Sequence, residues 1–434
     1  MMIGQTESYE YEQNEERFIP VALNDLVSKL IVDLDLPKDE QELFKRFCQI
    51  FIALYHAKFF AELQNLKENY LPFSPDRTTL PLQRYSNADL LLRRKNLITD
   101  IQEIIGKANY SPITQDELNL ALAETSPYGL DVSVDFDDFD EIHLYSRGSF
   151  IKTEQRRTWR TLYLRTETID IPIYQRLFLV LKLKPAAGSQ DKVSLLADPK
   201  AYLLEKWRHL FQMEMTKGGD SSFVYLKLFK DIPRPDLEML FPNTRVEMQR
   251  FDKVTMSVSG GGGVIGGILA VVSKIARAAN PAAIMLAVAG FMGIIWREAG
   301  KLLSNRNRYL AMLARSLYFH NLDNNLGVLA NLIEMAEEEE CKEAILAYGF
   351  LLAQRGEECS QQKLDRKVEQ YLHDAYGVRI NFELKDGIRK LREAGLLTKT
   401  AAPFVKPCSL SSALARLDLE WDDMFSFGDL SAGH

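Results

Sequence analysis

Two long stretches without a charged residue lie close together in the second half of this 434-residue sequence. Twenty uncharged residues separate Lys253 from Lys274, and nineteen separate Arg277 from Arg297. At about 1.5 Å per residue, each stretch could cross the roughly 30 Å hydrocarbon core of a bilayer as a helix. The segment 254–298 is therefore predicted to be a glycine-rich helical hairpin that lies on or through a membrane.

The two halves of this hairpin differ in apolar character. The first has seven strongly apolar residues and six glycines, worth on the order of −2 to −4 kcal/mol for insertion, which is marginal for an independent span. The second is more apolar, and Trp296 beside Arg297 fits an interfacial anchor. Small residues at four-residue spacing would let the helices pack closely, so we expect them to insert as a pair or to lie shallowly in the interface. These packing residues are Gly262, Gly263, Gly266, Gly267, Ala283, Ala287 and Gly290.

Two other interpretations of the hairpin remain open. Gly261, Gly263 and Gly266 match the GxGxxG pattern of a dinucleotide-binding turn, but no βαβ unit follows them. The hairpin could also be buried inside a soluble protein. Lys301, Arg306 and Arg308 follow it, where they would contact anionic headgroups at about 1 kcal/mol each or serve as ordinary flanking charges.

The composition limits the class of protein around the hairpin. With 26% charged residues and a mean hydropathy of −0.17, the chain reads as globular with a small membrane segment and not as a polytopic transporter. The net charge of −7 argues against attraction of the whole chain to nucleic acid or anionic lipid. The four cysteines are far apart, which indicates a reducing intracellular compartment, and the acidic N-terminus lacks the features of a signal peptide.

Hydrophobic periodicity predicts an α+β multidomain protein. Apolar residues at helical spacing predict a helical N-terminal domain over 1–122, including a long helix over Lys38–Glu68. Short runs rich in β-branched and aromatic residues predict an α+β domain with a mostly antiparallel sheet over 123–253. The hairpin at 254–298 follows, then a helical and winged-helix-like domain over 299–400, and a tail over 401–434.

The winged-helix-like unit covers Ser360–Thr400, where a helix, a strand at Val378–Phe382 and a second helix follow one another. Arg389, Lys390 and Arg392 lie on the second helix, where a DNA-binding protein would need basic side chains. In a membrane-anchored protein we favour a protein partner for this unit over nucleic acid.

Three segments around the hairpin carry a family resemblance. Phe223–Asn243 (FVYLKLFKDIPRPDLEMLFPN), Val258–Gly267 (VSGGGGVIGG) and Asn305–Asn325 (NRNRYLAMLARSLYFHNLDNN) resemble the domain-of-unknown-function family 3754. That family includes transmembrane protein 143 and many cyanobacterial and plastid members, and the similarity runs from about Phe139 to Leu397. The resemblance implies a two-segment membrane hairpin and no assigned activity. His320 stands where the family pattern often has a lysine.

No catalytic or metal-binding motif emerges from the residues, and no catalytic residue, metal site or cofactor is predicted. The acidic string at Asp135–Glu141 could collect a divalent cation, but it lacks calcium-loop spacing and is interpreted as a solvated strand edge. Glu337–Glu340 with Glu343 is interpreted as an exposed helix face, since no ExxH motif accompanies it.

The sequence thus predicts a non-enzymatic, membrane-anchored interaction or regulatory module with its soluble domains on one side of the bilayer. These domains would face a reducing compartment, on the cytoplasmic side of a bacterial inner or thylakoid membrane. The expected partners are membrane lipid, a protein bound by the winged-helix-like unit, and further copies of the chain. The alternatives are a lipid- or ion-handling protein whose hairpins oligomerise and a soluble hydrolase with a buried hairpin.

Overall fold

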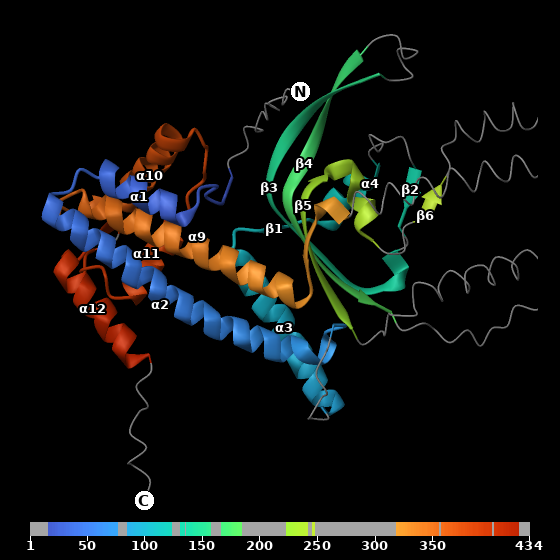
Figure 1. The fold of residues 1–434 in the computed structure, drawn as a ribbon, viewed down its shortest axis with the longest axis horizontal. Coiled ribbons are helices and arrows are strands. Elements are labelled where there is room, and N and C mark those ends of the chain that lie inside the picture. Colours follow the sequence, from blue (N-terminus) through green and yellow to red (C-terminus); the bar gives the residue numbers. More distant parts are fainter. Residues whose placement is uncertain are drawn as a thin grey trace, which may run out of the picture.

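A computed structural model gives the fold of the protein (Figure 1). It describes residues 16–76, 85–123, 131–134, 136–157, 166–184, 223–241, 245–247, 318–355, 357–401 and 403–424. In this part of the chain, a bundle of helices adjoins an antiparallel sheet, and two long helices, α2 (Lys38–Tyr70) and α9 (Leu326–Leu352), run from the bundle to the sheet.

The N-terminal helices form where the apolar periodicity predicts them. The structure has α1 at Leu23–Asp33, α2 at Lys38–Tyr70, α3 at Asn87–Lys107 and α4 at Gln115–Ala123. The apolar stripe of α2 is buried along its whole length, from Phe44 to Leu66. A reciprocal capping box between Ser86 and Asp89 fixes the start of α3, because it satisfies two of the free amides at the helix N-terminus.

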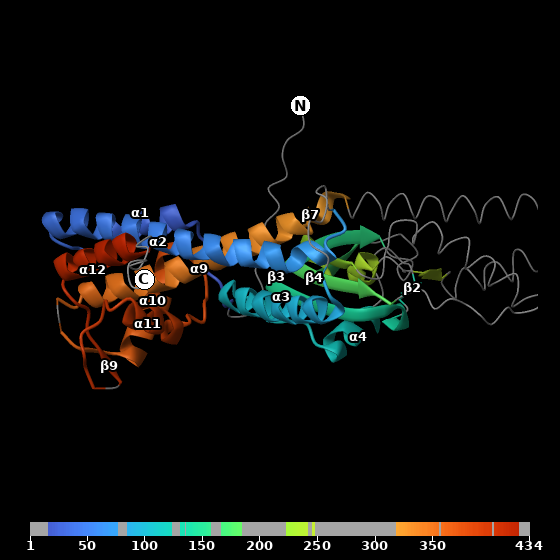
Figure 2. The ribbon, with the colours of Figure 1, turned by 90° about the horizontal axis from the view of Figure 1, so that it is seen from below.

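Helix α9 is the axis of the helical bundle. Eleven consecutive residues, 339–349, are buried, because α1, α2, α10 (Gln361–Tyr376) and α11 (Leu384–Glu393) all pack around it. The N-terminal and C-terminal helices therefore share one hydrophobic core. Figure 2, a perpendicular view, shows α1, α2, α9 and α12 (Leu410–Asp423) running side by side.

The main sheet has the strand order β1-β3-β4-β5-β7, and its neighbouring strands all pair antiparallel. The strands are β1 (Ser111–Pro112), β3 (Phe139–Arg157), β4 (Thr166–Leu183), β5 (Val224–Pro233) and β7 (Asn321–Asn324). Side chains alternate between its faces. On β4, Phe178 and Val180 pack against α2, α3 and α9, whereas Leu177 and Leu179 pack beneath α4 and the 3₁₀-helix η4 (Arg234–Leu240). A second small sheet pairs β2 (Asp131–Ser133) with β6 (Arg245–Glu247).

The C-terminal region departs from two predictions. The strand expected at Val378–Phe382 is reduced to an isolated parallel bridge between Ile380 and Glu16, because a single segment of the N-terminal chain is its partner. The prediction of a tail over 401–434 is also wrong for residues 403–424, which contain a strand and a helix. Strand β9 (Phe404–Val405) pairs with β8 (Cys359–Ser360), and α12 packs on α2 through a buried apolar face that includes Leu410, Ala413 and Leu417.

The predicted membrane hairpin at 254–298 lies outside the described residues. Among the helices that are described, none combines the length and the apolar character needed to cross a bilayer. The α+β class is confirmed for the described residues, whereas the hairpin and the winged-helix assignment remain predictions.

Candidate functional site

The hairpin residues predicted from the sequence all fall outside the described part of the chain. This applies to Gly262, Gly263, Gly266, Gly267, Ala283, Ala287, Gly290, Trp296, Arg297, Lys301, Arg306 and Arg308. Among the described residues, the candidate functional site lies at the junction of the helical bundle with the sheet.

The acidic turn of α9, Glu337–Glu343, is the centre of this junction. Its expected exposure on a solvated helix face is wrong for most of its carboxylates: Glu339 is 0% exposed, Glu340 5% and Glu343 3%. They are buried because neighbouring elements pack on their sides of α9, whereas the side chains of Glu337 and Glu338 stay 17% and 36% exposed. Buried charges of this kind require partners.

The first set of partners, here the Arg147 cluster, consists of Arg147 on β3 with Glu339 and Lys342 on α9. An Arg147 guanidinium nitrogen lies 2.9 Å from Oε1 of Glu339, and Nζ of Lys342 lies 3.1 Å from the same oxygen. Arg147 also stacks over the ring of Phe18 at 4.5 Å. One carboxylate thus joins the sheet to the central helix.

The same cluster holds the N-terminal segment 16–22. The amide of Ile19 donates to Oε2 of Glu339 at 2.9 Å, and the carbonyl of Ile19 accepts from Nζ of Lys342 at 2.9 Å. At its start, Glu16 pairs with the backbone around Ile380 and accepts a hydrogen bond from the amide of Ser149 on β3. This segment therefore contacts the sheet, α9 and the C-terminal region together.

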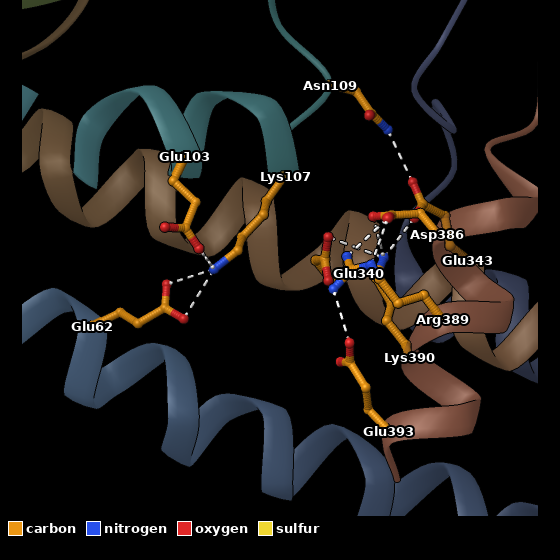
Figure 3. Close-up of polar contacts among 10 residues, drawn as sticks. All are labelled: Glu62, Glu103, Lys107, Asn109, Glu340, Glu343, Asp386, Arg389, Lys390 and Glu393. Atoms are coloured by element: carbon orange, nitrogen blue, oxygen red, sulfur yellow. Dashed lines mark hydrogen bonds and ion pairs between the residues drawn. The ribbon is translucent and has the colours of Figure 1, made fainter. Parts of the chain in front are cut away.

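The second set, the Lys390 cluster, joins α9 to α11 and is drawn in Figure 3. It contains Lys390 and Asp386 of α11 with Glu340 and Glu343 of α9. Nζ of Lys390 lies 2.6 Å from Glu343, 3.0 Å from Glu340 and 3.5 Å from Asp386. Burial by itself lowers the pKa of Lys390, but the carboxylates of Glu343 and Glu340 outweigh it and keep that pKa above its ordinary value. The lysine is therefore held as a cation.

Burial has the opposite effect on the carboxylates of this cluster. Desolvation raises the pKa of Glu343 to about 7, even though Lys390 stabilises its ionised form. Desolvation also raises the pKa of Glu340. Asp386 differs: burial raises its pKa, but the hydrogen bond from Arg389 and the charge of Lys390 outweigh that effect and lower the pKa below the ordinary value. Asp386 is thus ionised at neutral pH.

Residues from the sheet side complete the surroundings of the Lys390 cluster. The side-chain amide of Asn109, at the turn between α3 and β1, donates to Oε1 of Glu343 at 3.1 Å. Asn109 adopts a positive φ of 58°, which asparagine tolerates better than most residues. Nearby, Lys107 of α3 pairs with Glu62 and Glu103 (Figure 3).

Three carboxylates of the Lys390 cluster have a spacing that could also suit a metal ion. One oxygen each from Glu340, Glu343 and Asp386 lies within 4.8 Å of the others. The ammonium of Lys390 already bonds or pairs with all three. A metal ion would have to displace that ammonium, so this cluster is better explained as a closed ion-pair network.

A second region brings together two of the segments that carry the family resemblance. Strands β5 and β7 pair so that Lys227 lies opposite Asn324, and Nζ of Lys227 donates to Oδ1 of Asn324 at 3.2 Å. Nδ1 of His320 lies 2.8 Å from the carbonyl oxygen of Lys230. The contacts of this seam are thus largely those of strand pairing, which fits a structural role for His320.

Asn325 ends this seam and begins α9 in a backbone conformation, φ 51° and ψ −116°, that is rare for residues other than glycine. Its side-chain oxygen accepts from the hydroxyl of Tyr70 at 3.0 Å and from the amide of Leu226 at 3.2 Å. Its side-chain amide donates to Asp76. These bonds from α2, β5 and the loop after η1 (Leu71–Phe73) hold the strained turn in place.

The acidic string at the start of β3 is tied to basic neighbours. Asp140 pairs with Lys182 of β4 and with Arg94 of α3, and Arg94 also pairs with Glu141. The hydrogen bond from Lys182 lowers the pKa of Asp140. Asp140 and Glu141 therefore pair with neighbouring basic side chains and do not converge on a metal cation.

Reasoning from the sequence missed Lys390 as a buried residue and placed it among surface bases. The helix around it offered no such signal: Leu384, Ile388 and Leu391 define an apolar face, and Lys390 is six, two and one positions from them, so it does not share their face. For α9, the signal was that apolar residues dominate the helix before and after Glu337–Glu343, although Glu337 and Glu338 remain partly exposed.

Taken together, the described residues define an α+β protein in which a helical bundle and an antiparallel sheet are joined by buried ion-pair clusters. Residues 174–327 match the model of the family DUF3754, described as a protein of unknown function. This match supports the resemblance at the level of that family, and it spans most of β4, together with β5 and β7. No solved structure matches the chain at a significant level.

Proposed function

We propose that this protein is a non-enzymatic, membrane-anchored interaction or regulatory module. In this proposal the hairpin at 254–298 is the anchor, and the helical bundle with the sheet is the body that it holds at the membrane. The finer family assignment, to transmembrane protein 143-like proteins of cyanobacterial or plastid type, belongs to the same proposal.

The observation that carries the proposal is the continuity of α9. This helix starts at the strained turn after β7, at Leu326, follows the predicted hairpin at 254–298 in the chain, and runs for 27 residues into the C-terminal region. It packs against α11 along the way. A displacement at the β7 end would therefore be passed to the C-terminal region through one rigid element, which is what a regulatory module requires.

The C-terminal region supplies a candidate contact surface. After α9 come β8, α10 and α11, followed by Leu397, which pairs with Pro407 near the end of β9. This order of helix, strand, two helices and a strand pair is typical of a winged helix. In a DNA-binding protein Lys390 would have to face the nucleic acid, but here it is buried against α9. Arg389 pairs with Asp386 and Glu393. These pairings favour a protein partner over nucleic acid.

Membrane anchoring can be tested by carbonate extraction of cells that express the full chain or a variant whose residues 254–298 are replaced by a short Gly-Ser linker. We expect the full chain to stay with the membranes and the linker variant to be extracted. A full chain that appears in the supernatant would contradict anchoring. Protease treatment of sealed vesicles would then show whether the soluble portions lie on one side, facing the cytoplasm.

The regulatory half of the proposal needs a separate measurement. Amide hydrogen exchange of the full chain should differ between detergent and lipid vesicles in α10 and α11, because α9 connects them to the anchor. The linker variant is the matched control and should show no difference. Identical exchange in both conditions for the full chain would leave anchoring intact and contradict a regulatory coupling.

A further inference from the structure

We propose that Glu340 and Glu343 form a proton-binding pair at the crossing of α9 and α11, so that the contact between these helices holds one exchangeable proton around neutral pH. The proposal is independent of the membrane anchor. It concerns a pH-sensitive contact inside the body of the protein.

The geometry provides two carboxylates for one ammonium. Glu340 and Glu343 are three residues apart on α9 and therefore lie on one face of the helix. Both point at Nζ of Lys390, at 3.0 Å and 2.6 Å, and all three side chains are at most 6% exposed. With both carboxylates ionised, this buried contact carries one excess negative charge.

The remaining charged groups around the pair already have other partners and supply no spare cation. On α11, Asp386 pairs with Arg389 and lies 3.5 Å from Nζ of Lys390, and Arg389 also reaches Glu393. On α3, Lys107 is shared between Glu103 and Glu62 of α2. On α9 itself, Glu339 and Lys342 belong to the Arg147 cluster with Arg147 of β3. The neighbour from the α3–β1 turn, Asn109, is neutral.

Among the described residues, Lys107 of α3 is a basic group outside α11 that affects the pKa of Glu340. It lowers that pKa, but its effect is the smallest of those that act on Glu340. Tyr55 of α2 is also close enough to Glu340 to feel its charge. Burial is the main cause that raises the pKa of Tyr55, so this side chain is neutral near pH 7. A proton is therefore the simplest way to remove the excess charge, as in other carboxylate pairs that share one site.

The pKa values agree with this geometry. Burial raises the pKa of Glu343 to about 7, and burial also raises that of Glu340. Because the two groups are coupled, the proton belongs to the pair and not to one residue.

Loss of the proton should loosen the helix crossing. Helix α11 approaches α9 closely at Gly387, where an added Cβ would lie 3.0 Å from the carbonyl oxygen of Glu343. Two ionised carboxylates at this tight, buried crossing repel each other. Since the folded pKa lies above the unfolded one, the stabilising effect of the proton is complete below about pH 4.5 and is lost as the pH rises through about 7.

The test is the melting temperature of the full chain between pH 5 and pH 8.5, measured for the wild type and for Glu343→Gln, Glu340→Gln and Glu393→Gln. Glu393 is on α11 and its side chain is 63% exposed, so its variant is a control with the same change of charge. We expect the wild type and the control to lose stability in parallel as the pH rises. Both buried variants should lose less, so that their curves converge on or cross that of the wild type.

Curves for the two buried variants that stay parallel to the wild type across this range would overturn the proposal, whatever their absolute stability. If a buried variant fails to fold, infrared spectroscopy of the Glu16→Gln variant decides the question, because the raised pKa of Glu16 could otherwise contribute a band of the same kind. A carboxylic acid C=O band that persists above pH 6 and disappears near pH 7 to 8 supports the proton-binding pair. Absence of that band at pH 6 overturns it.

Discussion

Nζ of Lys390 on α11 lies 2.6 Å from Oε2 of Glu343 on α9, and both side chains are almost wholly buried. This pair joins residues 47 positions apart at the point where the C-terminal region meets the central helix. Around it, the carboxylates of Glu340 and Glu343 depend on the cation of Lys390 for their balance.

Replacement of Lys390 by methionine should destabilise the protein by about 3–5 kcal/mol, because it leaves the buried carboxylates of Glu340 and Glu343 without a cation. Urea unfolding would measure the loss. The exposed Lys385→Met on the same helix is the control and should change stability by no more than about 0.5 kcal/mol.

A triple variant separates the effect of an uncompensated charge from the loss of packing. Lys390→Met combined with Glu340→Leu and Glu343→Met removes the charges together, and we expect it to recover most of the stability lost by Lys390→Met alone. A triple variant as unstable as Lys390→Met alone would contradict this expectation. It would show that the contact between α9 and α11 needs the ion pairs, and not only the absence of an uncompensated charge.

Glu339→Gln should release the N-terminal segment. Glutamine can still accept one hydrogen bond, but Arg147 and Lys342 lose their shared anion, at a cost of about 3 kcal/mol. Trypsin should then cut faster after Arg17, which lies in this segment. Glu337→Gln, which affects a carboxylate paired with the exposed His56, should leave the rate of cleavage unchanged.

Gly148→Ala on β3 should destabilise the protein by about 1–3 kcal/mol. Gly148 has a φ of +73°, and an added Cβ would lie 2.6 Å from Gln175 and 2.7 Å from Phe18. Gly106→Ala in α3 is the opposite case, since an added Cβ there meets nothing within 4 Å. We expect that change to be neutral or to stabilise by up to about 1 kcal/mol. Thermal unfolding of both variants would show whether the two substitutions differ in sign.

Glu16 should give a second pH-dependent effect. Burial raises the pKa of Glu16, and this exceeds the opposing effects of the Ser149 amide and the charge of Arg147. Its contribution to stability is therefore present below about pH 4.5 and is lost as the pH rises. Glu16→Gln, which retains an acceptor for the Ser149 amide, should lose less stability than the wild type between pH 4.5 and pH 8. A profile parallel to that of the wild type would contradict this expectation.

The local elements of the described chain were largely predictable from the sequence. The stripe on α2 and the alternation on β4 follow from side-chain periods of 3.6 and 2 residues, which are properties of neighbouring residues. The end of the chain was predicted less well. Helix α12 lies in a region with Pro403 and Pro407 and has a short apolar face. Its stability depends on packing against α2, where Lys58 bonds to Glu420 across 362 positions.

The candidate site was less predictable than the fold. The Lys390 cluster joins α9 with α11, and the Arg147 cluster joins α9 with β3 and the N-terminal segment, so no local motif marks either of them. Glu339, Glu340 and Glu343 look like surface residues in isolation, because glutamate is usually exposed. Their burial is a property of the elements around α9.

By itself, the sequence determined most of the described helices and strands, the α+β class, the two uncharged stretches 254–273 and 278–296 and the resemblance to a family of unknown function. The tertiary structure decided that the first and last helical regions, predicted as separate domains, share one core around α9. It also decided which charges are buried. The physical reason is that periodicity records which face of an element is apolar. The element that covers this face, and whether a charged side chain is buried, depend on contacts between residues far apart in the sequence.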